Sequence, residues 1–158
     1  MPDADLPRGL RRLVYHSRFS ASFPRSVEDQ DYEIGRIIRS SIRNNRMIAV
    51  TGMLLVHGNS FLQALEGPDA AVRATYQRIL ADNRHIGARL LTQLPAERRL
   101  FSDWNMCAHR LSKADDAILD TMEKGLALDL GSLGGERALK LLTAVRDVQA
   151  KTLARGLV

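Results

Sequence analysis

The chain of 158 residues is 45% hydrophobic, which supports one domain of ordinary size with some additional structure. It contains no apolar run of about eighteen residues, and its polar start, Met1–Leu10, does not resemble a signal peptide, so we expect neither a membrane span nor secretion. The single cysteine, Cys107, excludes an internal disulfide and favours a reducing compartment, by default the cytoplasm. The formal net charge of +5 comes from arginines spread along the chain, which favours a solvated basic surface over a nucleic-acid-binding patch.

Residues 10–19 are predicted to form the first strand, in which alternation places Tyr15 on one face and Val14 and His16 on the other. After a polar connection, a helix is predicted from about residue 28 to residue 44, with acidic residues at its start, where they complement the helix dipole. The helical spacing turns isoleucine, serine and asparagine side chains inward together, which is unusual for a plain core face. These inward positions are Ile34, Ile38, Ser41 and Asn45, with Ile37 beside them.

Residues 47–56 are apolar and β-branched and predict a second strand, which a turn at 57–59 connects to a hairpin partner over 60–66. Within the partner strand, alternation places the primary amide of Gln63 in the middle of an apolar face. A buried amide has two donors and an acceptor, and all of them must find partners. Tyr15 and a Trp-Asn-Met segment near the end of the domain are the candidate partners.

A second helix is predicted over residues 69–83, with Asp69 as its N-cap, and strands are predicted over 88–94 and 104–109. The element order is strand, helix, strand, strand, helix, strand, strand. This order predicts a ferredoxin-like α+β sandwich with a five-stranded sheet.

Residues 112–128 and 136–153 predict two further helices after this domain. A glycine-rich turn separates them, so we expect an appended αα-hairpin and not a second domain. The hairpin could pack on the sheet face that carries Val14 and His16, away from Tyr15.

Six short stretches of the chain, in order, match the motifs of one known family. They read Leu-Val-Tyr-His-Ser at 13–17, Ser-Ser-Ile-Arg-Asn-Asn at 40–45, Thr-Gly-Met-Leu-Leu at 51–55, Phe-Leu-Gln-Ala-Leu-Glu-Gly-Pro at 61–68, Asp-Asn-Arg-His at 82–85 and Phe-Ser-Asp-Trp-Asn-Met at 101–106. Through them, residues 10–110 resemble a BLUF domain, the blue-light sensor that uses flavin, and residues 111–158 form an extension for output or oligomerisation. One departure is Arg99-Leu100-Phe101, where the family often has Arg-Arg-Phe.

The resemblance implies an oxidised flavin, FAD or alternatively FMN, held between the two helices with its ring edge facing the sheet. It implies that Tyr15 and Gln63 are photoactive and that Trp104 and Met106 lie beside Gln63. We expect the flavin contacts to come from Ile37, Ile38, Ser41, Asn44, Asn45, Leu54, Phe61, Gln63, Arg78, Ile79, Asp82, Arg84 and His85.

The hypothesis that follows is a light-operated regulatory switch without catalytic or metal chemistry. Blue light makes the flavin a strong oxidant, and Tyr15 donates an electron and a proton to it, through or past Gln63. The pair recombines with the Gln63 amide rotated or tautomerised, which changes its hydrogen bonds and shifts the flavin absorption slightly to the red. Nothing after residue 110 resembles a catalytic or DNA-binding domain, so we expect the output to reach a separate signalling protein or a homo-oligomer interface.

Two other function classes stay open from the residues alone. A ferredoxin-like acyl-phosphate hydrolase could recruit Arg18 and Asn45, although the sequence shows no compact anion loop. A basic nucleic-acid-binding module would need exposed aromatic residues among its arginines, and only 5% of the residues are aromatic. The sequence has no zinc-ligand spacing and no Walker, GxGxxG or GxSxG motif. A flavin spectrum of the purified protein would separate the sensor from both alternatives.

Overall fold

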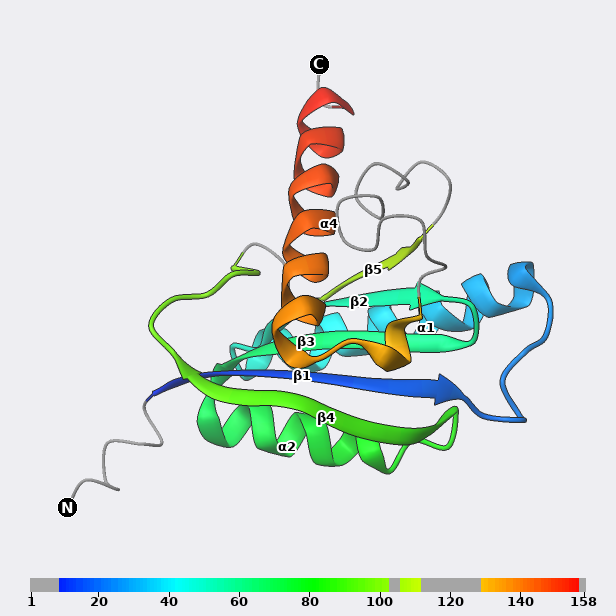
Figure 1. The fold of residues 1–158 in the computed structure, drawn as a ribbon, viewed down its shortest axis with the longest axis horizontal. Helices are drawn as coiled ribbons and strands as arrows, with labels where there is room; N and C mark the ends of the chain where they lie inside the picture. The colour runs from blue at the N-terminus through cyan, green and yellow to red at the C-terminus, as the bar shows by residue number, and fades with distance from the viewer. Residues whose placement is uncertain (1–8, 103–105, 112–128, 157–158) are drawn as a thin grey trace.

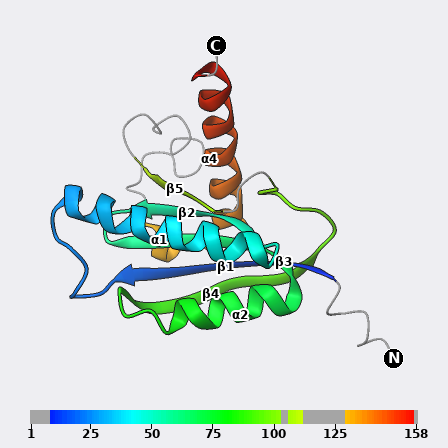
Figure 2. The same ribbon diagram turned by 180° about the vertical axis from the view of Figure 1, so that it is seen from behind.

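The computed structural model of the chain describes residues 9–102, 106–111 and 129–156. In chain order its elements are β1 (Leu10–Phe19), α1 (Val27–Met47), β2 (Thr51–His57), β3 (Ser60–Pro68), α2 (Asp69–Leu80), β4 (His85–Ala96), β5 (Cys107–Arg110), the short 3-10 helix η4 (Leu130–Ser132) and α4 (Gly135–Gly156). Figures 1 and 2 show one sheet with α1 and α2 on one face and α4 on the other. Within these ranges, no helix combines the length and the apolar character that a bilayer crossing requires.

The strand order across the sheet is β4-β1-β3-β2-β5, in which β5 runs parallel to β2 and all other neighbours are antiparallel. This arrangement confirms the ferredoxin-like sandwich and the five-stranded sheet predicted from the order of elements. The register places Tyr15 of β1 and Leu54 of β2 directly opposite Gln63, on either side of β3. Because directly opposed residues of antiparallel strands share a face, all three side chains point toward α1 and α2.

Several element boundaries differ from the prediction. Helix α1 continues to Met47 and has Ile48 as its C-cap, so β2 begins at Thr51 and the predicted strand start at residue 47 is wrong. The polar residues before Met47 are compatible with a helix, and Ala49 makes the following turn with a φ of 59°. Strand β4 is longer than predicted and continues through Pro95, which is tolerated because β4 lies at the edge of the sheet.

The start of α2 also corrects a prediction. Pro68 is the N-cap residue of α2 and makes no side-chain cap, so the predicted N-cap role of Asp69 is wrong. The Asp69 carboxylate instead accepts hydrogen bonds from Arg11 of β1 and from Arg73, one turn further along α2. Two arginines therefore compete with the helix N-terminus for this carboxylate, and tertiary contacts decide the outcome. At its other end α2 stops at Leu80, three residues before the predicted end at residue 83.

The two faces of the sheet bury separate hydrophobic clusters. Tyr15 belongs to the cluster beneath α1 and α2. Val14 is fully buried in the other cluster, beneath η4 and α4, and His16 on the same face is only 7% exposed beside Gly131 of η4. This placement confirms the expectation that the C-terminal extension covers Val14 and His16. Burial, with a smaller contribution from Arg89, lowers the pKa of His16 below its usual value.

Of the two helices predicted in the extension, the second is confirmed as α4, which is longer than the predicted 136–153 at both ends. The first, over residues 112–128, lies outside the described residues, so the αα-hairpin stays a prediction. Both ribbon views show α4 crossing the sheet and its C-terminal turns extending past β5, the edge strand (Figures 1 and 2).

Glu66 at the end of β3 anchors the segment that follows β4. Its side chain is completely buried and accepts a hydrogen bond from Arg12 Nε at 2.7 Å. It also accepts hydrogen bonds from the backbone amides of Leu100 and Phe101, at 2.9 Å and 2.7 Å. Arg146 of α4 donates to the Leu100 carbonyl at 2.7 Å, so β3 and α4 hold the same segment together.

Candidate functional site

A cleft with two lobes lies between α1 and α2, above the middle strands of the sheet. The larger lobe has a volume of about 180 Å³ and the smaller one about 60 Å³. The residues that line both lobes are Ile37, Ser41, Gln63, Ile79, Asp82 and Arg84. Ile37 of α1 and Ile79 of α2 form apolar walls, and β3 contributes the amide of Gln63. The smaller lobe is mainly apolar, whereas polar side chains make up most of the lining of the larger lobe.

The polar residues that α1 turns inward line the larger lobe. Asn45 is 2% exposed there, and Asn44 and Ser41 also contact this lobe. Because α1 continues past Asn45 to its C-cap at Ile48, Asn45 lies within the helix and is not its cap residue. From the other wall, α2 adds Arg78, whose Nη2 lies 3.4 Å from its neighbour Thr75 Oγ1.

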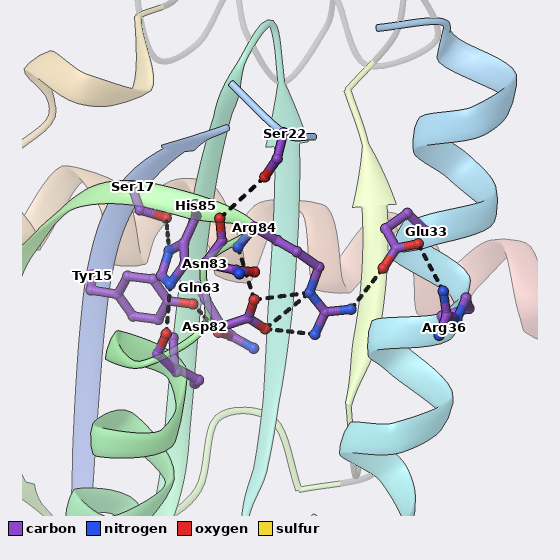
Figure 3. Close-up of polar contacts among 11 residues, drawn as sticks. Tyr15, Ser17, Ser22, Glu33, Arg36, Gln63, Asp82, Asn83, Arg84 and His85 are labelled. Carbon is purple, nitrogen blue, oxygen red and sulfur yellow. Dashed lines mark hydrogen bonds and ion pairs between the residues drawn. The ribbon is translucent and has the colours of Figure 1, made fainter. Parts of the chain in front are cut away.

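A buried row of two hydrogen bonds at the base of the cleft, called the line below, joins Tyr15, Gln63 and Met106. Figure 3 shows the Tyr15 hydroxyl pointing to Gln63, and Tyr15 Oη donates to Gln63 Oε1. On its other side, Gln63 Nε2 donates to Met106 Sδ at 3.2 Å. The exposed fractions of Tyr15 and Gln63 are 3% and 5%. Burial raises the pKa of Tyr15 far above its usual value, so the phenol stays neutral at any physiological pH.

His85 closes the smaller lobe through its ring. Its Nε2 lies 2.6 Å from the Ile79 carbonyl, which can only accept, so Nε2 carries a hydrogen. In the neutral ring Nδ1 then accepts from the Ser17 hydroxyl at 2.7 Å (Figure 3). Both nitrogens are engaged by the protein, and the ring packs near those of Tyr15 and Phe61, with centroid distances of 6.3 Å and 6.5 Å.

Asp82 and Arg84, in the turn between α2 and β4, form the polar edge shared by both lobes. Arg84 donates from Nε and Nη2 to the Asp82 carboxylate, at 2.9 Å and 2.5 Å. These hydrogen bonds hold the pKa of Asp82 below its usual value. The third nitrogen, Nη1, donates to Glu33 of α1 at 2.8 Å (Figure 3). Although Arg78 is four residues before Asp82, the Asp82 carboxylate pairs with Arg84.

The structure brings together most of the residues predicted to contact flavin. All of them except Ile38 line one lobe or both, including Leu54 and Phe61 in the smaller lobe. Ile38 instead lines a separate cavity of about 370 Å³ between α1 and β5. Ile38 lies on the side of α1 that also carries Ile34 and faces β5, whereas Ile37 lies on the side that faces the cleft. Trp104, predicted to lie beside Gln63, is outside the described residues.

Sequence reasoning missed four residues of this site. Ser40, Leu65 and Thr75 line the larger lobe, and Glu33 holds Arg84 at its end. Two of them carried a usable signal: Leu65 alternates with Gln63 on β3, and Glu33 precedes Ile37 by one helical turn. The contact between Glu33 and Arg84 joins residues far apart in sequence, and no local pattern indicates it.

The hydrolase alternative finds no site in this arrangement. Asn45 lines the larger lobe, whereas the Arg18 guanidinium lies beside Gly87, where β1 pairs with β4. Within the described ranges, no group of three or more histidine, cysteine, aspartate or glutamate side chains could hold a metal ion. The cleft fits an uncharged, planar, amphipathic ring such as a flavin, because Ile37 and Ile79 present apolar walls and the amides of Gln63 and Asn45 lie along its polar lining.

A family model described as sensors of blue light using FAD, abbreviated BLUF, matches residues 10–107. Among curated proteins, the blue light- and temperature-regulated antirepressor BluF of Escherichia coli K12 is 31% identical over 119 residues, which are 73% of this chain and 28% of that protein. The photoactivated adenylate cyclase subunit beta of Euglena gracilis is 35% identical over 97 residues, which are 61% of this chain and 11% of that protein. The chain thus spans less than a third of the length of these relatives.

Solved structures show the same fold. BlrB, a BLUF protein in its dark state, is 28% identical and superposes with a TM-score of 0.71 over 89% of this chain and 97% of that chain. The photo-activated state of BlsA is 21% identical, with a TM-score of 0.74 over 85% of this chain and 93% of that chain. At that lower identity, the likeness to BlsA shows the fold alone.

Proposed function

The chain belongs to the BLUF family of flavin-binding blue-light sensors, and we propose that Tyr15, Gln63 and Met106 form the switch of this sensor. The matched region is a sensor module and not an enzyme. One observation carries the proposal: the buried Gln63 amide has a hydroxyl on its oxygen and a thioether on its nitrogen. When bound, the flavin supplies blue-light absorption and oxidising power, while the protein supplies position and hydrogen bonds.

The two orientations of the Gln63 amide make different hydrogen bonds to its two partners, Tyr15 and Met106. The Tyr15 hydroxyl can donate or accept, so it can pair with either Oε1 or Nε2 of Gln63. The sulfur of Met106 has no hydrogen to donate and can pair only with Nε2. Rotating the amide therefore keeps a bond to Tyr15 and loses the contact to Met106. One hydrogen bond is worth about 0.5–1.5 kcal/mol net, and one to sulfur less, so the two orientations are close in free energy.

Tyr15 supplies the event that starts this rotation. Burial raises its pKa, so the phenol is neutral before the event. A phenol that has lost an electron is a strong acid, so its oxidation is accompanied by loss of the Oη proton. Gln63 Oε1 is the acceptor in direct contact. When the phenol is reduced again the proton returns, and the amide can settle rotated or tautomerised with its hydrogen bonds changed.

For the cofactor we propose FAD, which the family description names. A structure of BlrP1 from Klebsiella pneumoniae contains FMN, so related clefts accept the smaller flavin. FAD and FMN carry the same ring, so either flavin would place it between Ile37 and Ile79. Identification of the released cofactor by mass decides between them.

An absorption spectrum tests the switch. We expect the purified protein to show a flavin spectrum that shifts to the red under blue light and recovers in the dark. Tyr15→Phe should retain flavin and lose the shift, because the phenylalanine has no Oη proton to give up. Tyr76→Phe is the matched control, since the ring of Tyr76 lies 5.3 Å from that of Tyr15 but its hydroxyl is outside the line. A full shift in Tyr15→Phe would contradict the proposal.

The output is proposed to leave through β5 and α4, toward a separate signalling protein or a second copy of the chain. Met106 directly precedes β5, and His109 of β5 accepts a hydrogen bond at its Nδ1 from Gln149 of α4, at 2.8 Å. Residues 10–110 are thus the proposed sensor and residues 111–158 the proposed output element. Deleting the extension would expose the apolar face around Val14, so a point substitution tests the route better than a truncation.

Gln149→Ala should uncouple α4 from the switch. We expect the light-minus-dark difference in amide hydrogen exchange along α4 to disappear, while the red shift of the flavin stays. Lys140→Ala, an exposed change on the same helix, should preserve both signals. An unchanged exchange difference in Gln149→Ala would rule out this contact as the route.

A further inference from the structure

One end of the cleft is bridged by a chain of charged groups that includes Glu33, a residue that neither the expected flavin contacts nor the switch involves. Glu33 of α1 and Asp82 beyond α2 both bind Arg84, with Glu33 Oε1 and Arg84 Nη1 separated by 2.8 Å. Figure 3 shows the Arg84 side chain extending from the turn before β4 across to Glu33 on α1. The bridge therefore joins the two walls between which the cleft lies.

The position of Glu33 makes this bridge part of the cleft and not a remote surface pair. Glu33 lies one helical turn before Ile37, the residue of α1 that lines both lobes. Arg84 also lines both lobes. The side chains of Glu33 and Arg84 are 17% and 35% exposed, so the pair is half-buried, where a charge-assisted hydrogen bond is stronger than at an open surface.

Arg84 is held by two carboxylates in one extended conformation. Asp82 occupies its Nε and Nη2, and Glu33 alone holds the outer Nη1. If the carboxylate at position 33 is removed, Arg84 keeps Asp82 but loses the ion pair that joins it to α1. Its guanidinium is then free to swing away from α1, and that end of the cleft opens.

On this geometry, and on the premise that the cleft holds the flavin, we propose that Glu33 is a positioning residue. It holds Arg84 as a clasp across the cleft, and opening of the clasp controls how fast flavin leaves. Glu33 acts through Arg84 and has no part in the electron or proton transfer of the switch.

The rate of flavin release in the dark tests the clasp, measured on the flavin-loaded protein as the rise in free-flavin fluorescence after dilution. Glu33→Gln is nearly isosteric and should accelerate release roughly fivefold, as expected for the loss of one half-buried ion pair. Arg36→Gln is the matched control, because Arg36 contacts the other oxygen of Glu33, at 3.3 Å, with a side chain that is 59% exposed. This control should leave the release rate close to that of the original protein.

Two further measurements separate a clasp from a general loosening of the fold. In an Arg84→Gln background, Glu33→Gln should have no additional effect, since its partner is gone. Release from the unmodified protein should accelerate as salt is raised toward about 1 M, and Glu33→Gln should lack most of this dependence. An unchanged release rate in Glu33→Gln, or an equal acceleration in the Arg84→Gln background, would overturn the clasp. Failure of the switch shows separately, as a missing red shift in the unmodified protein.

Discussion

Gln63→Leu should leave the protein yellow and abolish its light-induced red shift. Leucine fills a volume close to that of glutamine, so the cleft between Ile37 and Ile79 keeps its shape and its flavin. It has no group to accept the Tyr15 proton or to change hydrogen bonds by rotation. The loss of the shift should therefore be complete and not partial. Steady-state spectra before and after blue illumination, at equal flavin loading, measure it.

The same substitution has a stability cost that can be separated from its effect on the switch. It leaves the buried Tyr15 hydroxyl without its acceptor, which costs about 1–3 kcal/mol, partly offset by the added apolar contact of the leucine. Gln93→Leu makes the same change on the edge strand β4 and should alter neither colour nor shift. If Gln63→Leu retained a full red shift, the amide could not be the switch.

Glu66→Ala should lower the free energy of unfolding by about 3–5 kcal/mol, as is typical when one partner of a buried ion pair is removed. The substitution takes away the acceptor for Arg12 and for the backbone amides of Leu100 and Phe101. It also leaves a cavity at the end of β3, where the side chain is completely buried. Denaturant titration followed by far-UV circular dichroism measures the loss.

The consequences of Glu66→Ala should reach α4. Arg146 binds the Leu100 carbonyl of the same segment, so a loosened segment weakens the hold on α4 as well. Glu97→Ala is the matched control, because it removes an exposed carboxylate from the same segment and should change stability by no more than about 0.5 kcal/mol. A loss in Glu66→Ala no larger than in this control would show that the buried carboxylate does not anchor the segment.

The periodicity of apolar residues in the sequence is sufficient to predict much of the fold. Alternation along two strands placed Tyr15 and Gln63 toward one layer and Val14 toward the other, and the sheet confirms both faces. A strand allows only two faces, so a period of two leaves little ambiguity once the apolar residues are known. Helix faces are less sharply defined, so the helical spacing predicts both Ile37 and Ile38 in the cleft, whereas the structure places only Ile37 there.

The details that the sequence could not supply are those in which residues far apart in the chain compete for one partner. Asp69 satisfies every local rule for an N-cap, yet Arg11 from a neighbouring strand binds its carboxylate. Asp82 binds Arg84 within one turn, and Glu33 of α1 binds the same guanidinium from across the cleft. Local patterns follow from backbone geometry and can be read along the chain. Ion pairs and amide orientations follow from distances that exist only after the helices have packed on the sheet.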